Sequence, residues 1–547
     1  MRPPGGRVAL WALAIALLAG GLYARSYHFD YTYLDDNLLI SDDLPYLSDL
    51  GHLPRVFGRT FFCPQVSGEK YYWSLVTGSL VINAAMFGGR LTSYHATNVL
   101  LHALVSALCL LLLLRFGFAL RLAVPGAAVF AVHPVLVGAV VWIPGRVYLM
   151  LGLFTIIALL GWLAWLERRR PLWLVVHLGG LAGALLCQEA AIVLPAALVL
   201  HDWLGVRPAR PRRLGPLWVG WAAVLVGWFV LWQSVALSGT QKQAGAYLQA
   251  FFAHAAAPLV YLGKVVWPRS LSVLPILRDS QWLPGLVALL LVLVALWLVR
   301  PSERRWVVWG LAWFVIWIAP SLPVADFIII ESRIYVSFLG LLVAGLALVR
   351  GLGQRRLPQR WGPAFAPTAV LLVGLLAWLS WDLSAAYRDR DALTAQAVRT
   401  SPHSALAQGN RGMVLTLADD LVGAERHFRA AIALAPRLPL IRGNLGAVLL
   451  RRDRLDEAQR YLYGELSLNP GNAQAHYNLA LLLQRRGQAE RAVEHFELAA
   501  DFNPSDVAAL GELLKYYAAR GDAVRAERYL RQMQALGVHF FQPPAER

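Results

Sequence analysis

Long apolar runs recur along most of the chain. A helix needs about 20 apolar residues to cross a bilayer. Two stretches are ambiguous: residues 75–88 are short, and residues 247–267 are interrupted by His254, Pro258 and Lys264. The pattern predicts an all-α polytopic membrane helix bundle of about 11 spans. The predicted spans cover residues 8–24, 94–115, 121–139, 147–166, 171–187, 190–204, 216–237, 283–299, 305–320, 333–350 and 364–382.

Arginines gather in short tracts between these runs, as the positive-inside rule predicts for cytoplasmic loops. The tracts lie at residues 168–170, 207–213, 300–305 and 350–360. With Arg2 and Arg7 inside, alternation through the spans places every tract in the cytoplasm, provided that residues 247–267 do not cross. We therefore expect 247–267 and 75–88 to be re-entrant or interfacial, the N-terminus to be cytoplasmic and the C-terminus external. A retained first helix is favoured over a signal peptide, because no convincing small-x-small cleavage site follows it.

A 34-residue period marks the C-terminal quarter. Ala at the tight contact of two helices and Pro closing the second helix, repeated at this spacing, are the signature of tetratricopeptide repeats (TPRs). The sequence predicts four helix pairs in a TPR α-solenoid over residues 404–537. The periodic positions are Pro402, Pro436, Pro470 and Pro504; Ala424, Ala458, Ala492 and Ala526; and Asn410, Asn444 and Asn478.

These patterns divide the chain into four parts. Residues 1–382 form the expected transmembrane domain, with an acidic external loop at 25–92. Residues 383–403 are a connector, 404–537 are the repeat array and 538–547 are a tail.

Composition supports a membrane protein. The chain is 58% hydrophobic and only 15% charged, against about 25% charged in soluble proteins. Its formal net charge of +17 follows from the cytoplasmic arginine tracts, and no basic face alternates with aromatics, so nucleic acid is not an expected partner. Three cysteines exclude a disulfide framework. The preference for Arg over Lys hints at a bacterial origin.

Seven charged or titratable residues from distant parts of the chain fall on the predicted external face. Such groups near a membrane are functional hypotheses by default. A carboxylate can act as general base on a hydroxyl, and an Arg can bind a phosphate through two hydrogen bonds. This is the chemistry needed to move a sugar from a polyprenyl phosphate to an acceptor. The residues are Asp35, Asp36, His133, Arg146, Glu189, Glu331 and Arg333.

Six of these seven residues also have a structural interpretation. Asp35 and Asp36 can cap a turn after the first span, and His133 beside Pro134 can be a hydrogen-bonded helix-end residue. Glu189, or Glu331 with Arg333, can form buried ion pairs that hold helices together. No spacing indicates a metal site, a Walker loop or a dinucleotide fingerprint, so no cofactor is assigned and a divalent metal is allowed but not indicated.

Five sequence blocks in a recognisable order carry a family resemblance. With the C-terminal repeats, they resemble the transmembrane-and-TPR O-mannosyltransferases and their bacterial relatives, of the GT-C class of polyprenyl-phosphate-sugar-dependent glycosyltransferases. The resemblance covers nearly the whole chain. The blocks are YLDDNLLI at 33–40, YHATNVLLHAL at 94–104, VFAVHPVLVGAVVWIPGR at 129–146, CQEAAIVLPAALVLHD at 187–202 and ESRIYVSFLGLLVAG at 331–345.

The resemblance implies a GT-C-like fold with its site on the extracytoplasmic side. It implies Asp35 or Asp36 as catalytic base, and His133, Arg146, Glu189, Glu331 and Arg333 around the donor phosphate and sugar. The chain departs from the family pattern twice. Gln188-Glu189 stands where relatives have Lys-Glu, and Tyr71-Tyr72-Trp73-Ser74 stands where they tend to have Tyr-Arg-Pro. These losses of basic residues leave the sugar open.

The sequence thus predicts an inverting glycosyltransferase of the bacterial inner membrane. Its partners are a polyprenyl-phosphate-linked sugar donor, membrane lipid, and a protein or other envelope acceptor presented by periplasmic repeats. Two alternatives stay open. One is a non-enzymatic membrane-anchored TPR scaffold for envelope assembly. The other is an O-antigen-ligase-like transferase, disfavoured because the large external loop is the first one instead of a late one.

Overall fold

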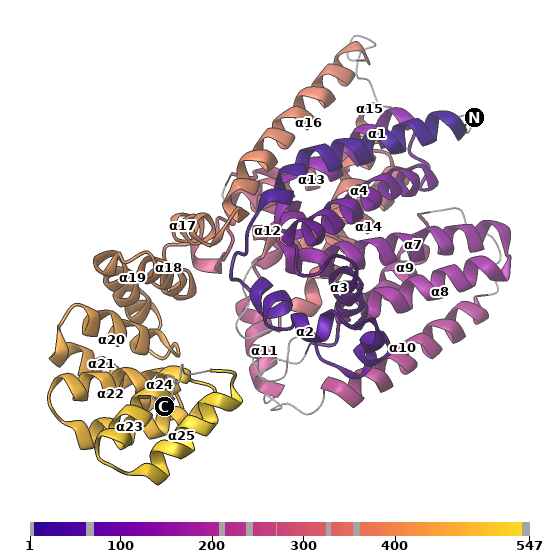
Figure 1. Ribbon diagram of the computed structural model, residues 1–547. Coiled ribbons are helices and arrows are strands. Elements are labelled where there is room, and N and C mark those ends of the chain that lie inside the picture. Colours follow the sequence, from indigo (N-terminus) through magenta and orange to yellow (C-terminus); the bar gives the residue numbers. More distant parts are fainter. Residues whose placement is uncertain are drawn as a thin grey trace. The chain divides into compact units, whose positions relative to one another are not determined.

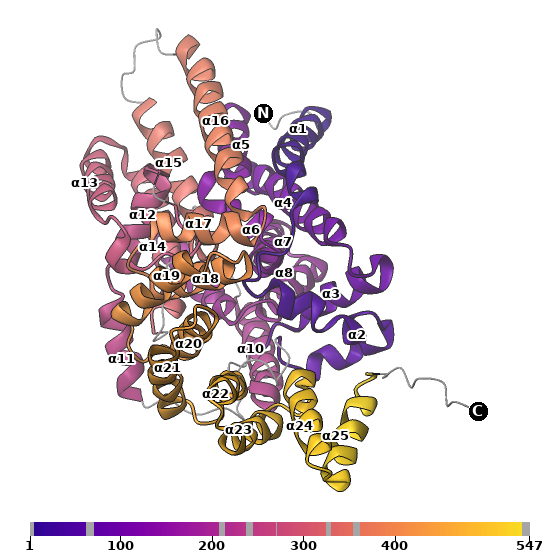
Figure 2. The same cartoon turned by 60° about the vertical axis from the view of Figure 1, so that its left-hand side comes forward.

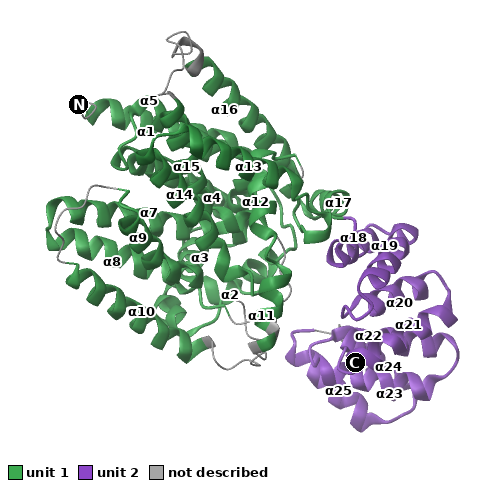
Figure 3. Ribbon diagram, turned by 180° about the vertical axis from the view of Figure 1, so that it is seen from behind, with its two compact units in different colours: residues 1–401 green, residues 402–547 purple. Residues whose placement is uncertain are grey.

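The computed structural model describes residues 5–61, 71–206, 214–236, 244–269, 271–323, 330–353 and 362–538. Every regular element in these ranges is a helix and none is a strand, which confirms the predicted all-α class (Figure 1). The chain divides into two compact units, residues 1–401 and 402–547 (Figure 3). The division falls inside the predicted connector. Residues 539–547 of the predicted tail lie outside the described ranges.

The first unit, called here the membrane unit, contains helices α1 to α17. Their bounds are α1 Gly5–Tyr23, α2 Leu44–Leu47, α3 Ser74–Phe87, α4 Leu91–Arg115, α5 Leu120–Val132, α6 Val137–Val141, α7 Arg146–Arg168, α8 Pro171–Leu185, α9 Leu194–Trp203, α10 Gly215–Ala236, α11 Ala244–Ala253, α12 Ala257–Val266, α13 Leu283–Leu298, α14 Pro301–Ile318, α15 Ser337–Gly353, α16 Gly362–Ser384 and α17 Arg390–Thr400.

Five helical stretches of the described chain are long and apolar enough to cross a membrane. A sixth is added if the bent pair Leu120–Val132 and Pro134–Val141 counts as one span. Several other predicted spans form shorter helices. For example, α8 has 15 residues and is therefore about 22 Å long, against a hydrocarbon core of about 30 Å. The five stretches are Gly5–His28, Leu91–Arg115, Ile143–Arg168, Gly215–Val235 and Ala366–Tyr387.

The two ambiguous stretches form short helices. Residues 247–267 divide into α11 and α12, each of 10 residues, and residues 75–88 lie in the 14-residue α3. None of these three helices has the length of a span. The count of about 11 spans and the orientation stay predictions.

The helices of the membrane unit pack in sequential and long-range pairs. Helix α1 packs against α4 and α5, α7 against α4 and α8, and α5 against α15 and α16 (Figure 2). Helices α14 and α15 approach most closely at Gly310 and Gly340, where a Cβ on either residue would lie 2.4 Å from the other's carbonyl oxygen. Small residues allow such close backbone contact between apolar helices.

An irregular buried segment joins α5 to α7. It consists of a 3₁₀ turn at Pro134–Leu136, the short helix α6 and a second 3₁₀ turn at Ile143–Gly145. Helix α5 and the following helical segment are bent by 48°. Non-helical backbone at membrane depth is tolerated when protein surrounds it, and every residue from Phe130 to Leu151 is buried.

The second unit, called here the repeat unit, consists of four helix pairs. Its core includes Ala424, Ala458 and Ala492, which are 0–2% exposed, together with Phe428, Leu462 and Phe496. Asp and Asn side chains cap several helices, as Asp420 does for the amide of Gly423. The helices are α18 Ala405–Leu417, α19 Leu421–Leu434, α20 Ile441–Arg451, α21 Leu455–Leu468, α22 Ala473–Arg485, α23 Ala489–Phe502, α24 Val507–Ala519 and α25 Ala523–Ala535.

Candidate functional site

The two adjacent aspartates of the first loop have different surroundings. Asp36 is 1% exposed, and its Oδ2 accepts hydrogen bonds of 2.7 Å from both the amide and the hydroxyl of Thr32. Its Oδ1 accepts from the amide of Asn37 at 3.0 Å. Burial raises the pKa of Asp36, and the hydrogen bonds from Thr32 and Asn37 act in the opposite direction. The Asp36 carboxylate therefore stabilises the conformation of the loop from Thr32 to Asn37.

Asp35 is only partly buried and has a left-handed backbone, with φ at +71°. Tyr33, two residues earlier, has φ at +56°. Non-glycine residues rarely adopt this region, and such strain persists only where the surroundings enforce it. The left-handed turn thus places Asp35 and Asp36 in different surroundings, with Asp35 partly exposed and Asp36 buried.

His133 lies at the end of α5. Its Nε2 is 3.1 Å from the carbonyl oxygen of Val265, and its Nδ1 accepts from the amide of Val135 at 3.2 Å. These two contacts assign the proton to Nε2. The imidazole ring is 4.7 Å from the ring of Phe338 on α15. His133 thus joins the irregular segment to α12 and α15.

Arg146 is fully buried at the start of α7. Its Nε donates to Asn98 Oδ1 at 2.9 Å, and its Nη2 donates to Asn83 Oδ1 and to the carbonyl of Tyr94, both at 3.0 Å. Its Nη1 donates to the carbonyl of Ser79 at 3.4 Å. All three guanidinium nitrogens therefore tie α7 to α3 and α4. This geometry favours a positioning role, and the predicted contact of Arg146 with a donor phosphate stays a prediction.

Glu189 connects the turn after α8 to the end of the first loop. Its Oε2 accepts from the indole of Trp73 at 2.8 Å and its Oε1 from the amide of Tyr72 at 3.3 Å. The low-polarity surroundings raise the pKa of Glu189, while these hydrogen bonds lower it. The two places where the chain departs from the family pattern are thus in direct contact.

Glu331 forms a buried ion pair that the sequence analysis did not assign. Its Oε1 is 2.6 Å from Nζ of Lys264, and both side chains are less than 10% exposed. The same oxygen accepts from the amide of Ser272 at 3.1 Å. The sequence analysis treated Lys264 as an interruption of residues 247–267, although a lysine in an apolar run is itself a signal of a buried partner. Arg333 lies two residues further along the same 3₁₀ turn, Glu331–Ile334, and is partly exposed.

The aspartate loop, the irregular segment between α5 and α7 and the turn that contains Glu331 lie close together in the membrane unit. The indole of Trp142 donates to the carbonyl of Leu34 at 2.9 Å, which joins the aspartate loop to the irregular segment. Gly138 touches Tyr387, since a Cβ there would lie 2.8 Å from the tyrosine oxygen. Tyr387 and Gly138 line a small cavity together with Glu331. The Glu189 turn instead contacts residues 72–75.

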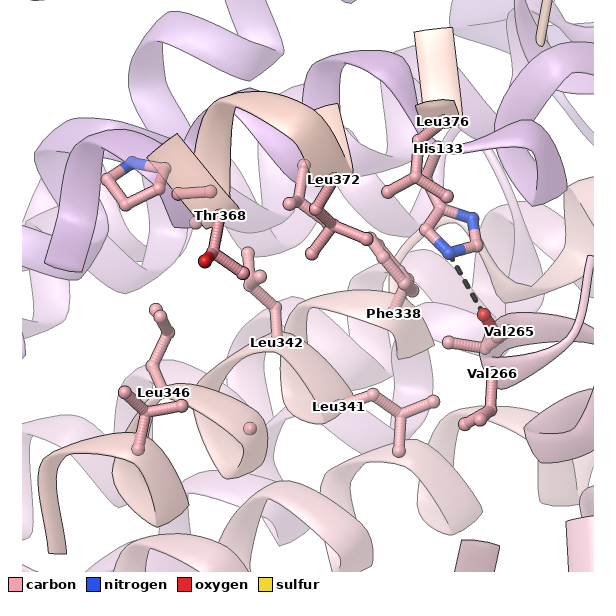
Figure 4. Close-up of a pocket in the computed structure, with 16 residues that line it drawn as sticks. His133, Val265, Val266, Phe338, Leu341, Leu342, Leu346, Thr368, Leu372 and Leu376 are labelled. Atoms are coloured by element: carbon pink, nitrogen blue, oxygen red, sulfur yellow. Dashed lines mark hydrogen bonds between the residues drawn. The ribbon is translucent and has the colours of Figure 1, made fainter. Parts of the chain in front are cut away.

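A larger apolar cavity of about 390 Å³ lies between α5, α15 and α16 and ends at His133 (Figure 4). Figure 4 shows Phe338, Leu342 and Leu372 around it, with His133 at one end and Thr368 toward the other. These two are the only lining side chains that carry a polar group. The cavity therefore suits an apolar chain, and both ring nitrogens of His133 at its end are already hydrogen-bonded to Val265 and Val135. Within the described ranges, no three His, Cys, Asp or Glu residues are grouped to hold a metal.

Comparison with known proteins gives partial matches. A family model of the tetratricopeptide repeat matches residues 466–494. Protein O-mannosyl-transferase TMTC4 of Homo sapiens is 28% identical over 220 residues, which cover 36% of this chain and 29% of that protein. The Mus musculus protein of the same name is 26% identical over 221 residues, with the same coverage. The match thus spans less than a third of the length of these curated relatives.

Among solved structures, MamA from Desulfovibrio magneticus RS-1 is 20% identical to this chain, with a TM-score of 0.24. The match covers 31% of this chain and 94% of the MamA chain. A likeness this weak carries no argument. The chain is therefore a multi-pass membrane protein by its candidate spans, with a tetratricopeptide repeat near its C-terminus and distant similarity to a protein O-mannosyl-transferase.

Proposed function

We propose that this protein is an inverting GT-C-type glycosyltransferase that takes a sugar from a polyprenyl-phosphate donor. The observation that supports this most is the apolar cavity that ends at His133, beside the carbonyl of Val265. An isoprenoid chain fits its apolar lining, and the donor phosphate would lie beyond the His133 end, because both ring nitrogens of His133 are hydrogen-bonded within the protein. The distant similarity to a protein O-mannosyl-transferase agrees with this chemistry.

Asp35 is the better base of the pair. Both oxygens of Asp36 already accept hydrogen bonds from Thr32 and Asn37, whereas Asp35 is partly exposed. In the proposed reaction the Asp35 carboxylate accepts the proton of an acceptor hydroxyl. The hydroxyl oxygen bonds to the anomeric carbon as the bond from that carbon to the phosphate oxygen breaks, and the electron pair leaves with polyprenyl phosphate. Arg333 would offset the charge on the departing phosphate.

The remaining parts of the proposal concern topology and acceptor. About 11 spans with a cytoplasmic N-terminus would place the first loop and the repeat unit on the extracytoplasmic face of a bacterial inner membrane. Helical repeats of this class present curved surfaces to proteins or peptides. The repeats would therefore hold a protein or other envelope acceptor while the membrane unit transfers the sugar.

The test is transfer of radiolabelled sugar from a panel of polyprenyl-phosphate-sugar donors in membranes that contain the full chain. Asp35→Asn should lower transfer at least about a hundredfold, as loss of a general base does. Asp42→Asn, an exposed aspartate of the same loop, should leave transfer unchanged. Equal transfer by Asp35→Asn and wild type would remove Asp35 from the mechanism. A product that retains the donor's anomeric configuration would exclude single displacement, and no transfer from any donor would favour the scaffold.

A further inference from the structure

A second cavity, of about 520 Å³, lies where α16 ends and α17 begins. One wall is the segment after α12, with Pro268, Arg269 and Leu271, and the other includes Leu379 and Leu383 of α16. The polar lining differs from that of the His133 cavity. It consists of three arginines, Arg269, Arg388 and Arg399, with Asp382 and Gln396.

The charges around this cavity leave two arginines without a carboxylate partner. Arg388 pairs with Asp389 at 2.8 Å, and Asp382 acts electrostatically on Arg25. Arg399 donates to the amide oxygen of Gln396. Within the described part of the chain, neither Arg269 nor Arg399 forms an ion pair. Both side chains are exposed, so the cavity presents excess positive charge and free guanidinium donors.

The position of the cavity is that of a membrane–water boundary. The candidate span Ala366–Tyr387 ends here, and Arg269 lies over the ring of Trp267 at 5.4 Å. Trp267, Trp378 and Trp381 are each about half exposed or more. Exposed tryptophans at the ends of spans are typical of the headgroup level of a bilayer.

We infer that this cavity binds the phosphate of an anionic phospholipid headgroup. A guanidinium binds phosphate through two parallel hydrogen bonds, and basic pockets between membrane helices bind anionic headgroups. The leucines and alanines of the walls suit the glycerol and first methylenes of the lipid. The inference does not depend on glycosyl transfer.

The cavity also adjoins the candidate site. Leu271 and Leu383 line both this cavity and the small cavity that contains Glu331 and Tyr387. A lipid bound between α16 and α17 would therefore lie one layer of side chains from Glu331, and it would hold the end of α16 in place.

The experiment measures lipid binding to the purified full-length protein by native mass spectrometry and by thermal unfolding in a neutral detergent. Phosphatidylglycerol should bind and raise the unfolding temperature, and phosphatidylcholine should do so at least about tenfold more weakly. Arg269→Gln/Arg399→Gln should lower the affinity for phosphatidylglycerol at least about tenfold. Arg269→Lys/Arg399→Lys should lower this affinity less, because lysine keeps the positive charge but cannot donate two parallel hydrogen bonds to the phosphate.

The matched control is Arg168→Gln/Arg170→Gln, which removes two exposed arginines at and just after the C-terminal end of α7 and should leave the affinity unchanged. An unchanged affinity in the Arg269/Arg399 variant, or an equal loss in the control, would overturn the inference. Inorganic phosphate or glycerol 3-phosphate that protects as well as the lipid at equal concentration would overturn the assignment to a headgroup.

Discussion

The repeat unit and the membrane unit hold their charged residues in different ways. In the repeat unit three arginines spaced 34 residues apart form similar ion pairs. Arg452, Arg486 and Arg520 each reach back to an acid in the second helix of the preceding repeat, and these acids are Glu425, Asp456 and Glu490. In the membrane unit each buried charge has its own arrangement, such as the four oxygens around Arg146 or the lysine beside Glu331.

The difference follows from solvent. Water can replace either partner of an exposed ion pair, so the Arg486–Asp456 and Arg520–Glu490 pairs each contribute little to stability. A buried charge that loses its partner has no replacement, so its surroundings are specific and come from distant segments. Lys264 and Glu331, for example, are 67 residues apart.

The largest expected effect comes from breaking the buried pair in the membrane unit. Lys264→Met removes the ammonium group 2.6 Å from Glu331, so among the described residues the buried carboxylate keeps the hydrogen bond from the Ser272 amide alone. Such a change costs roughly 3–5 kcal/mol of unfolding free energy. Lys264→Met/Glu331→Gln should recover part of this loss. The matched control is Lys515→Met, which breaks an exposed pair with Glu512 at the cost of less than about 1 kcal/mol.

Buried thiols give a readout specific to the membrane unit. Cys109 and Cys187 are fully buried, so in a Cys63→Ser background a thiol-reactive dye reports only when this unit opens. Lys264→Met should lower the temperature of labelling clearly, and Lys515→Met should not change it. Equal labelling temperatures for Lys264→Met and wild type would contradict the view that this pair holds the membrane unit together.

The same contrast explains what the sequence predicted. The 34-residue period placed the repeat helices because each repeat buries the same positions, as Ala424, Ala458 and Ala492 demonstrate. Local helix-forming patterns also predicted an all-α membrane unit. The sequence predicted the break between α8 and α9, but it did not predict how long each membrane helix is, as the division of residues 247–267 into α11 and α12 illustrates.

The candidate site was predicted as a set of residues but not as a set of contacts. Asp36 and Thr32 are four residues apart, and their hydrogen bonds required the positive-φ turn at Asp35 that no local pattern indicated. Lys264, the partner of Glu331, lies in residues 247–267, which the sequence predicted to be re-entrant or interfacial. Pairs of polar residues from separate apolar segments carry no sequence spacing that identifies them.

An intermediate effect is expected from pH in the repeat unit. Nδ1 of His476 and Nδ1 of His495 are 3.0 Å apart, and Nε2 of His476 donates to the carbonyl of Pro470. Burial, followed by the charge of His476, lowers the pKa of His495 below its usual 6.5, while Arg491 and Glu494 act in opposite directions. Below about pH 6.5 the unfolded state therefore binds more protons, and stability is lost as pH falls from 7.5 to 5.5.

Hydrogen exchange in α22 and α23 measures this loss. After correction for intrinsic rates, amides in these helices should exchange faster at pH 5.5 than at pH 7.5, by less than about tenfold because His495 is partly exposed. His476→Gln/His495→Gln should remove most of the pH dependence. A variant that keeps the full dependence would assign it to other groups.

The smallest expected effect is the loss of one exposed ion pair between successive repeats. Arg486→Gln removes the contact with Asp456, whose side chain is 93% exposed, and this should cost less than about 1 kcal/mol. Because Arg520 and Glu490 lie 34 residues after Arg486 and Asp456, Arg520→Gln should cost a similar amount, and the double variant should be close to additive. Arg452 instead pairs with Glu425, whose side chain is only 10% exposed, so Arg452→Gln should cost more. Urea unfolding followed by circular dichroism at low and high salt gives the comparison, since salt weakens exposed pairs. A cost of about 3 kcal/mol for Arg486→Gln or Arg520→Gln would mean that water does not replace the lost guanidinium group. These exposed ion pairs would then stabilise the protein as much as the buried Lys264–Glu331 pair does.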